Sequence, residues 1–368
     1  MKFSCDKELI LSAVSVAARN VSPKSSIAAL MGILVEVTDV VKVTGYNMET
    51  GVALEMEADI EEEGTLVLTA RLFADILRKL PDDVVYFSSK DFMVTISCGK
   101  AKFDILAIDP EEFPALPVVD DNQGILLEQK ALKSLIGDTL FSVSMSESRP
   151  IHTGALCEVE DGVLTMVAVD GYRLALRREP VSDVMGAAPF SFVVPAAALS
   201  EMEKICMAGD VMVRFNHTHV LFQTEQATLI SRRIEGEFLN YRDTLPKNNK
   251  IQVIGDVRDL SSCVERVSLM ISEKLKVPLR CYLEGNNMEF SCKTAIGEAK
   301  DTCSMEGPGG ELEIGFNNRY LLEAIRHAPA DKVRMEFSTP VAPCLIMPEN
   351  PDEDHFCYMV LPVRLKAN

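Results

Sequence analysis

The sequence predicts an α+β fold built from three similar domains in tandem. Two observations predict it: one pattern of helices and strands recurs at a spacing of about 120 to 125 residues, and the strands alternate apolar with polar positions. Such alternation is typical of antiparallel sheets with one covered face. Each copy is expected to contain a first helix, a polar loop, a strand pair, a second helix and a closing strand pair.

The repeat is clearest in two kinds of segment, one that follows the first helix and one that contains the second helix. The segments of the second kind all end in a phenylalanine. A period this long exceeds the roughly 20 to 50 residues of solenoid units, so each copy is expected to be a domain with its own core. The aligned segments are 26–37, 149–159 and 276–284 for the first kind, and 69–87, 194–215 and 315–337 for the second.

Proline-rich and turn-forming stretches separate the copies at 110–124 and at 241–250. We therefore expect domains at 1–122, 123–246 and 247–368. A chain of 368 residues with 47% hydrophobic residues is long enough for sizeable cores. Three similar domains in a row suggest an arc, whose concave surface would suit a long polymer better than a small substrate.

Six amphipathic helices are expected, two in each domain. In segment 69–80, for example, apolar side chains recur at helical spacing from Leu72 to Leu80. The formal charge of the chain is -18, yet the six helices hold 12 Lys or Arg against 10 Asp or Glu, while the remainder holds 25 against 45. Basic helix residues would line a track for phosphate groups only if all six helices face one concavity. The expected helices span 6–20, 69–80, 129–141, 195–207, 256–271 and 317–327.

The strands show the alternation that one covered face requires, and Asp-Gly pairs at 161–162 and 170–171 supply turns. The residues expected on covered faces include Val41, Val43, Leu66, Leu68, Val94, Ile96, Phe103 and Ile105.

Composition favours a cytoplasmic protein. The chain has no apolar run of about 18 residues, and its start lacks the basic and apolar regions of a signal peptide. Ten cysteines without a CxxC pair are expected to be small buried hydrophobes in a reducing compartment.

Motifs for catalysis or cofactor binding are missing from the sequence. It contains no HExxH, GxxxxGK, GxGxxG or GxSxG motif, and His217 and His219 lack an evident third metal ligand. We therefore expect a protein that is not an enzyme and that needs no cofactor or metal.

Two segments, 167–176 and 358–365, carry a resemblance to a known family. With the threefold repeat and the Met-Lys-Phe start, the Asp-Gly-Tyr-Arg-Leu segment and the Tyr-Met-Val-Leu-Pro-Val-Arg-Leu ending resemble the bacterial sliding clamps, the beta subunits of DNA polymerase III. The resemblance covers essentially the whole chain. It implies a DNA clamp fold in which each chain is a crescent, with helices inside and sheets outside. Two crescents would close head to tail into a homodimeric ring around double-stranded DNA, without catalysis, and would tether the polymerase for processivity.

The resemblance also implies sites. A pocket for short peptides from the polymerase III alpha subunit, the clamp loader and repair proteins would lie between the second and third domains. In three of its positions this chain departs from the family pattern: His152 replaces an aliphatic residue, Leu239 a proline and Asp243 a basic residue. The implied pocket residues are His152, Gly171, Tyr172, Arg173, Leu174, Leu239, Asp243, Thr244, Met359, Val360, Leu361, Pro362, Val363, Arg364 and Leu365; the implied DNA contacts are Lys24, Arg71, Arg78, Lys79, Lys133, Arg149 and Arg266.

For the dimer, the resemblance pairs an edge strand at 99–108 with one at 296–305. Opposite charges would favour this partner, although strand pairing and apolar contact should contribute most of the stability. The implied interface residues are Lys100, Lys102, Phe103, Ile105, Met270, Ile271, Glu298 and Asp301.

Two alternatives remain open at the level of the sequence. The three repeats could form an acidic scaffold that binds only proteins and does not encircle DNA. Scattered carboxylates could instead build the active site of a metal-dependent enzyme.

Overall fold

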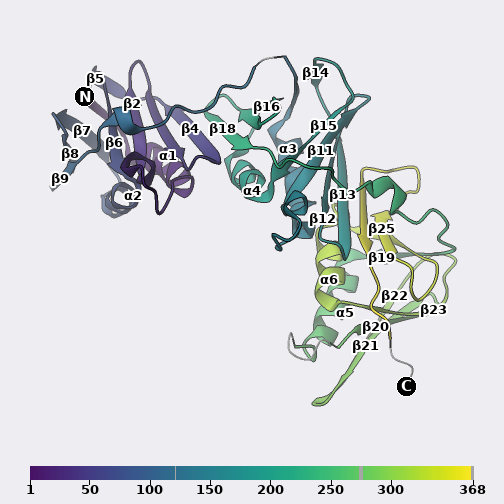
Figure 1. Ribbon diagram of the computed structural model, residues 1–368. Helices are drawn as coiled ribbons and strands as arrows, with labels where there is room; N and C mark the ends of the chain where they lie inside the picture. The colour runs from purple at the N-terminus through teal and green to yellow at the C-terminus, as the bar shows by residue number, and fades with distance from the viewer. Residues whose placement is uncertain (121, 273–276, 366–368) are drawn as a thin grey trace. The chain divides into compact units, whose positions relative to one another are not determined.

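The computed structural model of the protein describes residues 1–120, 122–272 and 277–365. Within them lie six α-helices and four antiparallel sheets, which confirms the predicted α+β class. The chain divides into two compact units (Figure 1): the first comprises Met1–Lys130, Ser182–Ala187 and Lys204–Arg233, and the second Ala131–Val181, Ala188–Glu203 and Ile234–Asn368. Residue 276 of the third aligned segment, residue 121 beside the first domain limit and the last three residues lie outside the described residues.

The first unit contains a five-stranded and a nine-stranded sheet. The smaller sheet has the order β5 (Asp59–Glu62), β1 (Lys2–Asp6), β7 (Val84–Lys90), β8 (Met93–Cys98) and β9 (Ala101–Leu106). The larger sheet has the order β14 (Asp183–Met185), β10 (Gly124–Glu128), β16 (Asp210–Phe215), β17 (His219–Gln223), β18 (Ala227–Arg232), β4 (Thr50–Met56), β3 (Val41–Tyr46), β2 (Gly32–Val37) and β6 (Gly64–Thr69).

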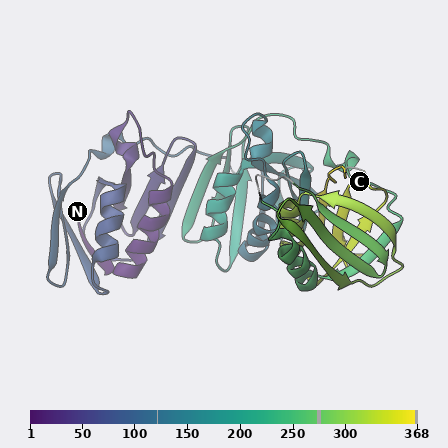
Figure 2. The ribbon, with the colours of Figure 1, turned by 90° about the horizontal axis from the view of Figure 1, so that it is seen from below.

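Helices α1 (Lys7–Arg19) and α2 (Ala70–Lys79) pack side by side on these sheets (Figure 2). The side chain of Asp6 caps α1, because its Oδ1 accepts a hydrogen bond from the Glu8 amide at 2.7 Å. Gly45 in β3 allows α1 to approach closely, since a Cβ there would lie 2.1 Å from the Ala17 carbonyl oxygen. In the core, the rings of Phe3 and Phe87 stack with centroids 4.5 Å apart.

The second unit contains an eight-stranded and a four-stranded sheet. The larger sheet has the order β15 (Phe190–Pro195), β11 (Gly154–Glu160), β12 (Val163–Val169), β13 (Arg173–Pro180), β26 (Phe356–Val360), β25 (Cys344–Pro348), β24 (Lys332–Phe337) and β19 (Ile251–Asp256). The smaller sheet has the order β22 (Gly297–Ser304), β21 (Asn287–Thr294), β20 (Leu279–Gly285) and β23 (Gly310–Phe316).

Helices α5 (Val257–Ser268) and α6 (Asn318–Arg326) pack against each other, and α5 also contacts β21 and β22. The side chains of Asp256 and Asn317 cap these two helices by accepting backbone N–H bonds. The remaining helices are α3 (Gln129–Gly137) and α4 (Ala196–Ile205), and the border between the two units falls within both.

The threefold repeat is visible in the order of the elements. In each third of the chain a strand precedes a helix, and a second helix leads into three strands. The expected strand pairs were wrong in number: four or five strands, not two, lie between the two helices, and the closing pair is a group of three. The phenylalanines that end the aligned segments, Phe87, Phe215 and Phe337, are all buried. Because the nine-stranded and eight-stranded sheets each combine strands from two repeats, the repeats do not coincide with the two compact units. The domain limits after residues 122 and 246 stay a prediction.

Several local expectations were wrong. The third helix ends at Gly137 rather than at residue 141, and a 3-10 turn follows at Leu140–Ser142. The fifth helix ends at Ser268 rather than at residue 271, and Leu72, expected on the apolar face of the second helix, is 48% exposed. Phe103, expected on a covered face, is 37% exposed because β9 is the last strand of its sheet. All ten cysteines are buried, as their number and spacing predicted.

Candidate functional site

A cavity of about 210 Å³ lies in the second unit at the ends of β13 and β26; we call it the primary pocket. Its floor is apolar, because Leu174 and Met359 lie opposite each other in the sheet and are 1% and 7% exposed. Tyr172 and Leu239 are exposed at its rim. The complete lining is Val169, Gly171, Tyr172, Arg173, Leu174, Leu239, Thr244, Pro343, Met359 and Leu361.

A tight turn between β12 and β13 shapes one wall of the primary pocket. Gly171 has a φ of +90°, a conformation that favours glycine. The Oδ1 atom of Asp170 accepts hydrogen bonds from the backbone amides of Tyr172 and Arg173, at 2.9 and 3.0 Å. This Asx turn explains why an Asp-Gly pair precedes the pocket strand.

Arg173 connects this turn to helix α6. Its side chain is 7% exposed, and its Nε donates to Asp170 Oδ2 at 3.0 Å. Its two terminal nitrogens donate to Glu323 and to the carbonyl oxygen of Phe141. The guanidinium also lies 4.5 Å from the ring centroid of Tyr320, a cation–π contact. A buried arginine with all of these partners fixes the wall of the pocket.

The charge of Glu323 depends on this arginine. Burial acts to raise the pKa of Glu323, but hydrogen bonds from Arg173 and Arg319 outweigh it and lower the pKa below its ordinary value. The carboxylate therefore stays ionised at neutral pH. Arg319 reaches the same carboxylate from the exposed side of α6, with its Nε 2.9 Å from Oε1.

Tyr172 and Tyr320 form an aromatic surface beside the primary pocket, which we call the aromatic ledge. Their rings stack with centroids 6.0 Å apart. Burial, followed by the nearby Asp170 carboxylate, raises the pKa of the Tyr320 hydroxyl, so it remains protonated. The ledge offers a flat apolar surface with hydroxyl groups at its edge, which suits a peptide side chain.

Eight of the predicted pocket residues line the cavity, and seven lie elsewhere. His152 is buried and meets the ring of Phe238 edge-on at 5.6 Å; burial, followed by the charge of Arg149, lowers its pKa. Asp243 is exposed and accepts a hydrogen bond from Asn240 at 2.7 Å. Val360 is fully buried in the core on the opposite side of β26.

The last predicted pocket residues, Pro362 to Leu365, turn toward β23. The Val363 amide donates to the Gly315 carbonyl at 2.8 Å, and a Cβ at Gly315 would lie 2.5 Å from the Leu365 side chain. The C-terminal segment is thus fixed against the smaller sheet. Two lining residues, Val169 and Pro343, were not predicted; Val169 lies in the singled-out segment 167–176, whereas no signal in the sequence marks Pro343.

All seven predicted DNA-contact residues are exposed on helices or on loops that follow helices. Several of the basic side chains are already paired within the chain. Arg71 and Arg78 lie 4.0 and 2.7 Å from Asp75 on the same helix, and Arg266 lies 2.6 Å from Asp301 on β22. Arg71, Arg78 and Lys79 belong to α2, Lys133 to α3 and Arg266 to α5, while Lys24 and Arg149 lie in loops.

The predicted interface strands β9 and β22 are both edge strands, each with one neighbour in its sheet. Phe103 and Ile105 belong to β9, and Lys102 on the same strand pairs with Asp104 at 3.3 Å. Lys100 lies in the turn before β9.

On the other predicted strand, β22 carries Glu298 and Asp301, and Asp301 already has Arg266 as a partner. Met270 and Ile271 are half-buried just after α5 and pack on the core. Lys102 and Asp301 therefore already have partners in their own chain, which would compete with charge pairing across an interface.

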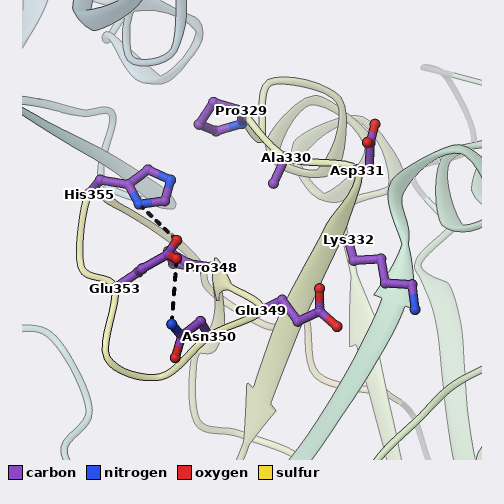
Figure 3. A pocket seen from close by; sticks show the side chains of 9 residues that line it. All are labelled: Pro329, Ala330, Asp331, Lys332, Pro348, Glu349, Asn350, Glu353 and His355. Carbon is purple, nitrogen blue, oxygen red and sulfur yellow. Dashed lines mark hydrogen bonds and ion pairs between the residues drawn. The ribbon is translucent and has the colours of Figure 1, made fainter.

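A larger cavity of about 530 Å³ lies beside the end of α6 (Figure 3). Its His355 lies 3.5 Å from Glu353, and burial lowers the pKa of that imidazole. Within the described residues, no cluster of three or more His, Cys, Asp or Glu side chains is arranged to hold a metal ion. None of the helices in the described part of the chain has the length and apolar character needed to span a membrane.

Comparison with known proteins identifies the family. Sequence models of the N-terminal, central and C-terminal domains of the DNA polymerase III beta subunit match residues 1–117, 126–240 and 242–364. The beta sliding clamp of Halalkalibacterium halodurans is 31% identical over 382 residues, which cover 99% of this chain and 100% of the relative.

Solved structures agree with the sequence matches. The DNA polymerase sliding clamp of Bacillus subtilis is 28% identical, with a TM-score of 0.92 and complete coverage of both chains. The beta subunit from the DNA polymerase of Streptococcus pyogenes is 26% identical, with a TM-score of 0.92 over 99% of this chain and 100% of that one. The chain therefore belongs to the DNA polymerase III beta-subunit family, the bacterial beta sliding clamps.

Proposed function

We propose that the protein is a processivity clamp that closes as a head-to-tail homodimer around double-stranded DNA and tethers the replicative polymerase. It acts in the cytoplasm and catalyses no reaction itself. The family match along the whole chain does not favour the alternative of an acidic scaffold without DNA encirclement.

The observation that carries the proposal is the pair of edge strands β9 and β22. Each strand ends a sheet; Leu106 on β9 is 69% exposed, and Ile296, in the turn directly before β22, is 75% exposed. An exposed apolar edge strand promotes aggregation unless another strand covers it. Because β9 lies in the first third of the chain and β22 in the last third, mutual pairing in two copies satisfies both edges and closes a ring.

Distribution of charge supports DNA encirclement despite the net charge of -18. The seven basic residues predicted to contact DNA are exposed, five of them on helices. Acidic residues elsewhere repel DNA from the outside of such a ring, and loose phosphate contacts without base recognition allow the ring to slide. Encirclement then keeps the protein on the DNA although its contacts with the phosphates are weak.

The primary pocket supports the tethering role. Its apolar floor and exposed aromatic rim fit a short linear peptide with apolar anchors, which the polymerase alpha subunit, the clamp loader and other clamp-binding proteins would present. Leu361 lines the pocket, and its backbone amide donates to the Tyr172 carbonyl at 2.9 Å, so strand and turn hold it in place.

Sedimentation equilibrium of the purified protein tests the ring. We expect a mass of twice 40.6 kDa at micromolar concentration. Replacing Ile296 with Asp should shift the mass toward the monomer, whereas Met145→Asp, on a side chain that is 94% exposed and far from either edge strand in sequence, should leave it unchanged. A wild-type monomer at micromolar concentration would contradict the proposal.

A further inference from the structure

A second cavity, of about 250 Å³, lies beside the primary pocket in the same unit. We call it the accessory groove and define it by Leu176, Leu245, Leu345, Met347, Glu336 and Asp354. Its four apolar members come from β13, from the connector before β19 and from β25. None of the residues predicted from the sequence for the peptide pocket lies in this groove.

The accessory groove continues the floor of the primary pocket. Leu174 and Met359, which form that floor, pair in register, and Met359 pairs in turn with Leu345. Leu345 pairs with Glu336. Residues directly opposite each other in antiparallel strands point to the same face, so one row of side chains leads from the primary pocket into the groove.

The distance between the two cavities is short. Leu174 lines the primary pocket and Leu176 the groove, and residues two apart on a strand are separated by about 6.6 Å. Thr244 and Leu245, neighbours in the connector, line the pocket and the groove respectively. An extended peptide advances by about 3.3 Å per residue, so a flank of two to four residues spans the step.

An acidic turn adjoins the groove. Asp354 is exposed and belongs to the acidic turn that also contains Asp352 and Glu353. Among the residues that line the groove, Arg178 pairs with Asp354, and Glu336 lies 3.1 Å from Arg334, so each lining carboxylate has a cation of its own chain. The excess negative charge comes from Asp352 and Glu353, which are exposed in the adjacent turn and do not line the groove. A ligand with a positive charge beside an apolar group matches this combination of apolar floor and adjacent acidic turn.

We infer that the accessory groove binds the flank of the same linear peptide whose core fills the primary pocket, and that this flank carries an aliphatic residue followed by Lys or Arg. The inference rests on the proposed peptide-binding function of the primary pocket and adds a requirement for the sequence around the core motif. Partners whose motif has such a flank would bind more tightly than partners with the core alone.

The test begins with hexapeptides selected from a random display library on the full-length protein. Only those that bind the wild type but not a Leu361→Glu variant are kept, because Leu361 lines the primary pocket alone. Each selected hexapeptide is labelled with fluorescein and extended at either end by Gly-Ser-Leu-Lys, Gly-Ser-Leu-Glu or Gly-Ser-Gly-Ser. Fluorescence anisotropy then gives the dissociation constants.

We expect the Leu-Lys extension at one end of the hexapeptide to lower the dissociation constant about tenfold relative to the Gly-Ser-Gly-Ser extension. Partial burial of one leucine side chain is sufficient for that change. The Leu-Glu extension should gain less, because the acidic turn beside the groove repels it. Met347→Glu should abolish the gain while the unextended hexapeptide binds as it does to the wild type. Met145→Glu, the matched change on a fully exposed methionine, should retain the gain.

The outcomes separate the two claims. A Leu-Lys extension that gains less than twofold, or a gain that survives Met347→Glu, overturns the inference while the primary pocket stands. If no selected hexapeptide depends on Leu361, the proposed peptide-binding function fails and the inference fails with it.

Discussion

Replacing Arg173 with Ala should destabilise the second unit far more than replacing Arg319, although both arginines pair with Glu323. Arg173 is 7% exposed and Arg319 is 69% exposed. Arg173→Ala leaves Asp170 and Glu323, with side chains 12% and 26% exposed, without their buried cation. Breaking a buried pair costs about 3–5 kcal/mol, and partial solvation of Glu323 with its remaining Arg319 contact reduces this to about 3 kcal/mol.

The control variant, Arg319→Ala, removes an exposed pair four residues apart on one helix, which is worth about 0.3–0.5 kcal/mol. Urea unfolding followed by far-UV circular dichroism measures both changes in the free energy of unfolding. A double-mutant cycle of Arg173→Ala with Glu323→Ala should give a coupling energy of about 1–3 kcal/mol. Equal losses in the two single variants, or a loss below about 1 kcal/mol for Arg173→Ala, would refute the assignment of Arg173 as the buried tie between β13 and α6.

Two further predictions concern charge. Burial raises the pKa of Asp138 to about 6, although Arg177 at 3.2 Å and His327 act to lower it. Protonation of this carboxyl therefore stabilises the folded state. The contribution is complete below the ordinary pKa of 3.8 and is lost as the pH rises through about 6. The free energy of unfolding of the wild type should therefore fall relative to Asp138→Asn between about pH 4 and 6.5, and a constant difference across this range would show that the carboxyl is not perturbed. Lys100→Glu should raise the monomer fraction in sedimentation more than Lys102→Glu, because Lys102 already has Asp104 as a partner. Equal sedimentation profiles for both variants would argue against a role for Lys100 at the interface.

Local patterns were sufficient to predict the six helices but not the number of strands around them. The apolar spacing in 69–80 predicts the buried face of α2, where Phe73, Ile76 and Leu77 are all buried. The helix expected at 129–141 ends at Gly137. The Thr139 hydroxyl donates a hydrogen bond to the Leu135 carbonyl, and the chain then forms a 3-10 turn at Leu140–Ser142. Periodicity alone does not reveal that a turn replaces the last helical residues.

The site was predictable only where its residues lie in one segment. The Asp-Gly turn and the C-terminal segment marked Gly171 to Leu174, Met359 and Leu361, which line the primary pocket. The bond from Arg173 to Glu323 joins residues 150 positions apart, and nothing in either segment indicates it. Likewise, contact of Leu365 with Gly315 depends on the tertiary arrangement of the C-terminal segment beside β23.

The most direct test of enclosure compares retention on circular and linear DNA. Labelled protein is loaded by a clamp loader onto a nicked circular plasmid, and half of the complex is cut once with a restriction enzyme before gel filtration at a salt concentration that suppresses phosphate contacts. We expect the protein to stay with the intact circle and to leave the linear DNA through its ends. Equal retention on both forms would show that adhesion holds the protein on DNA and would contradict the ring.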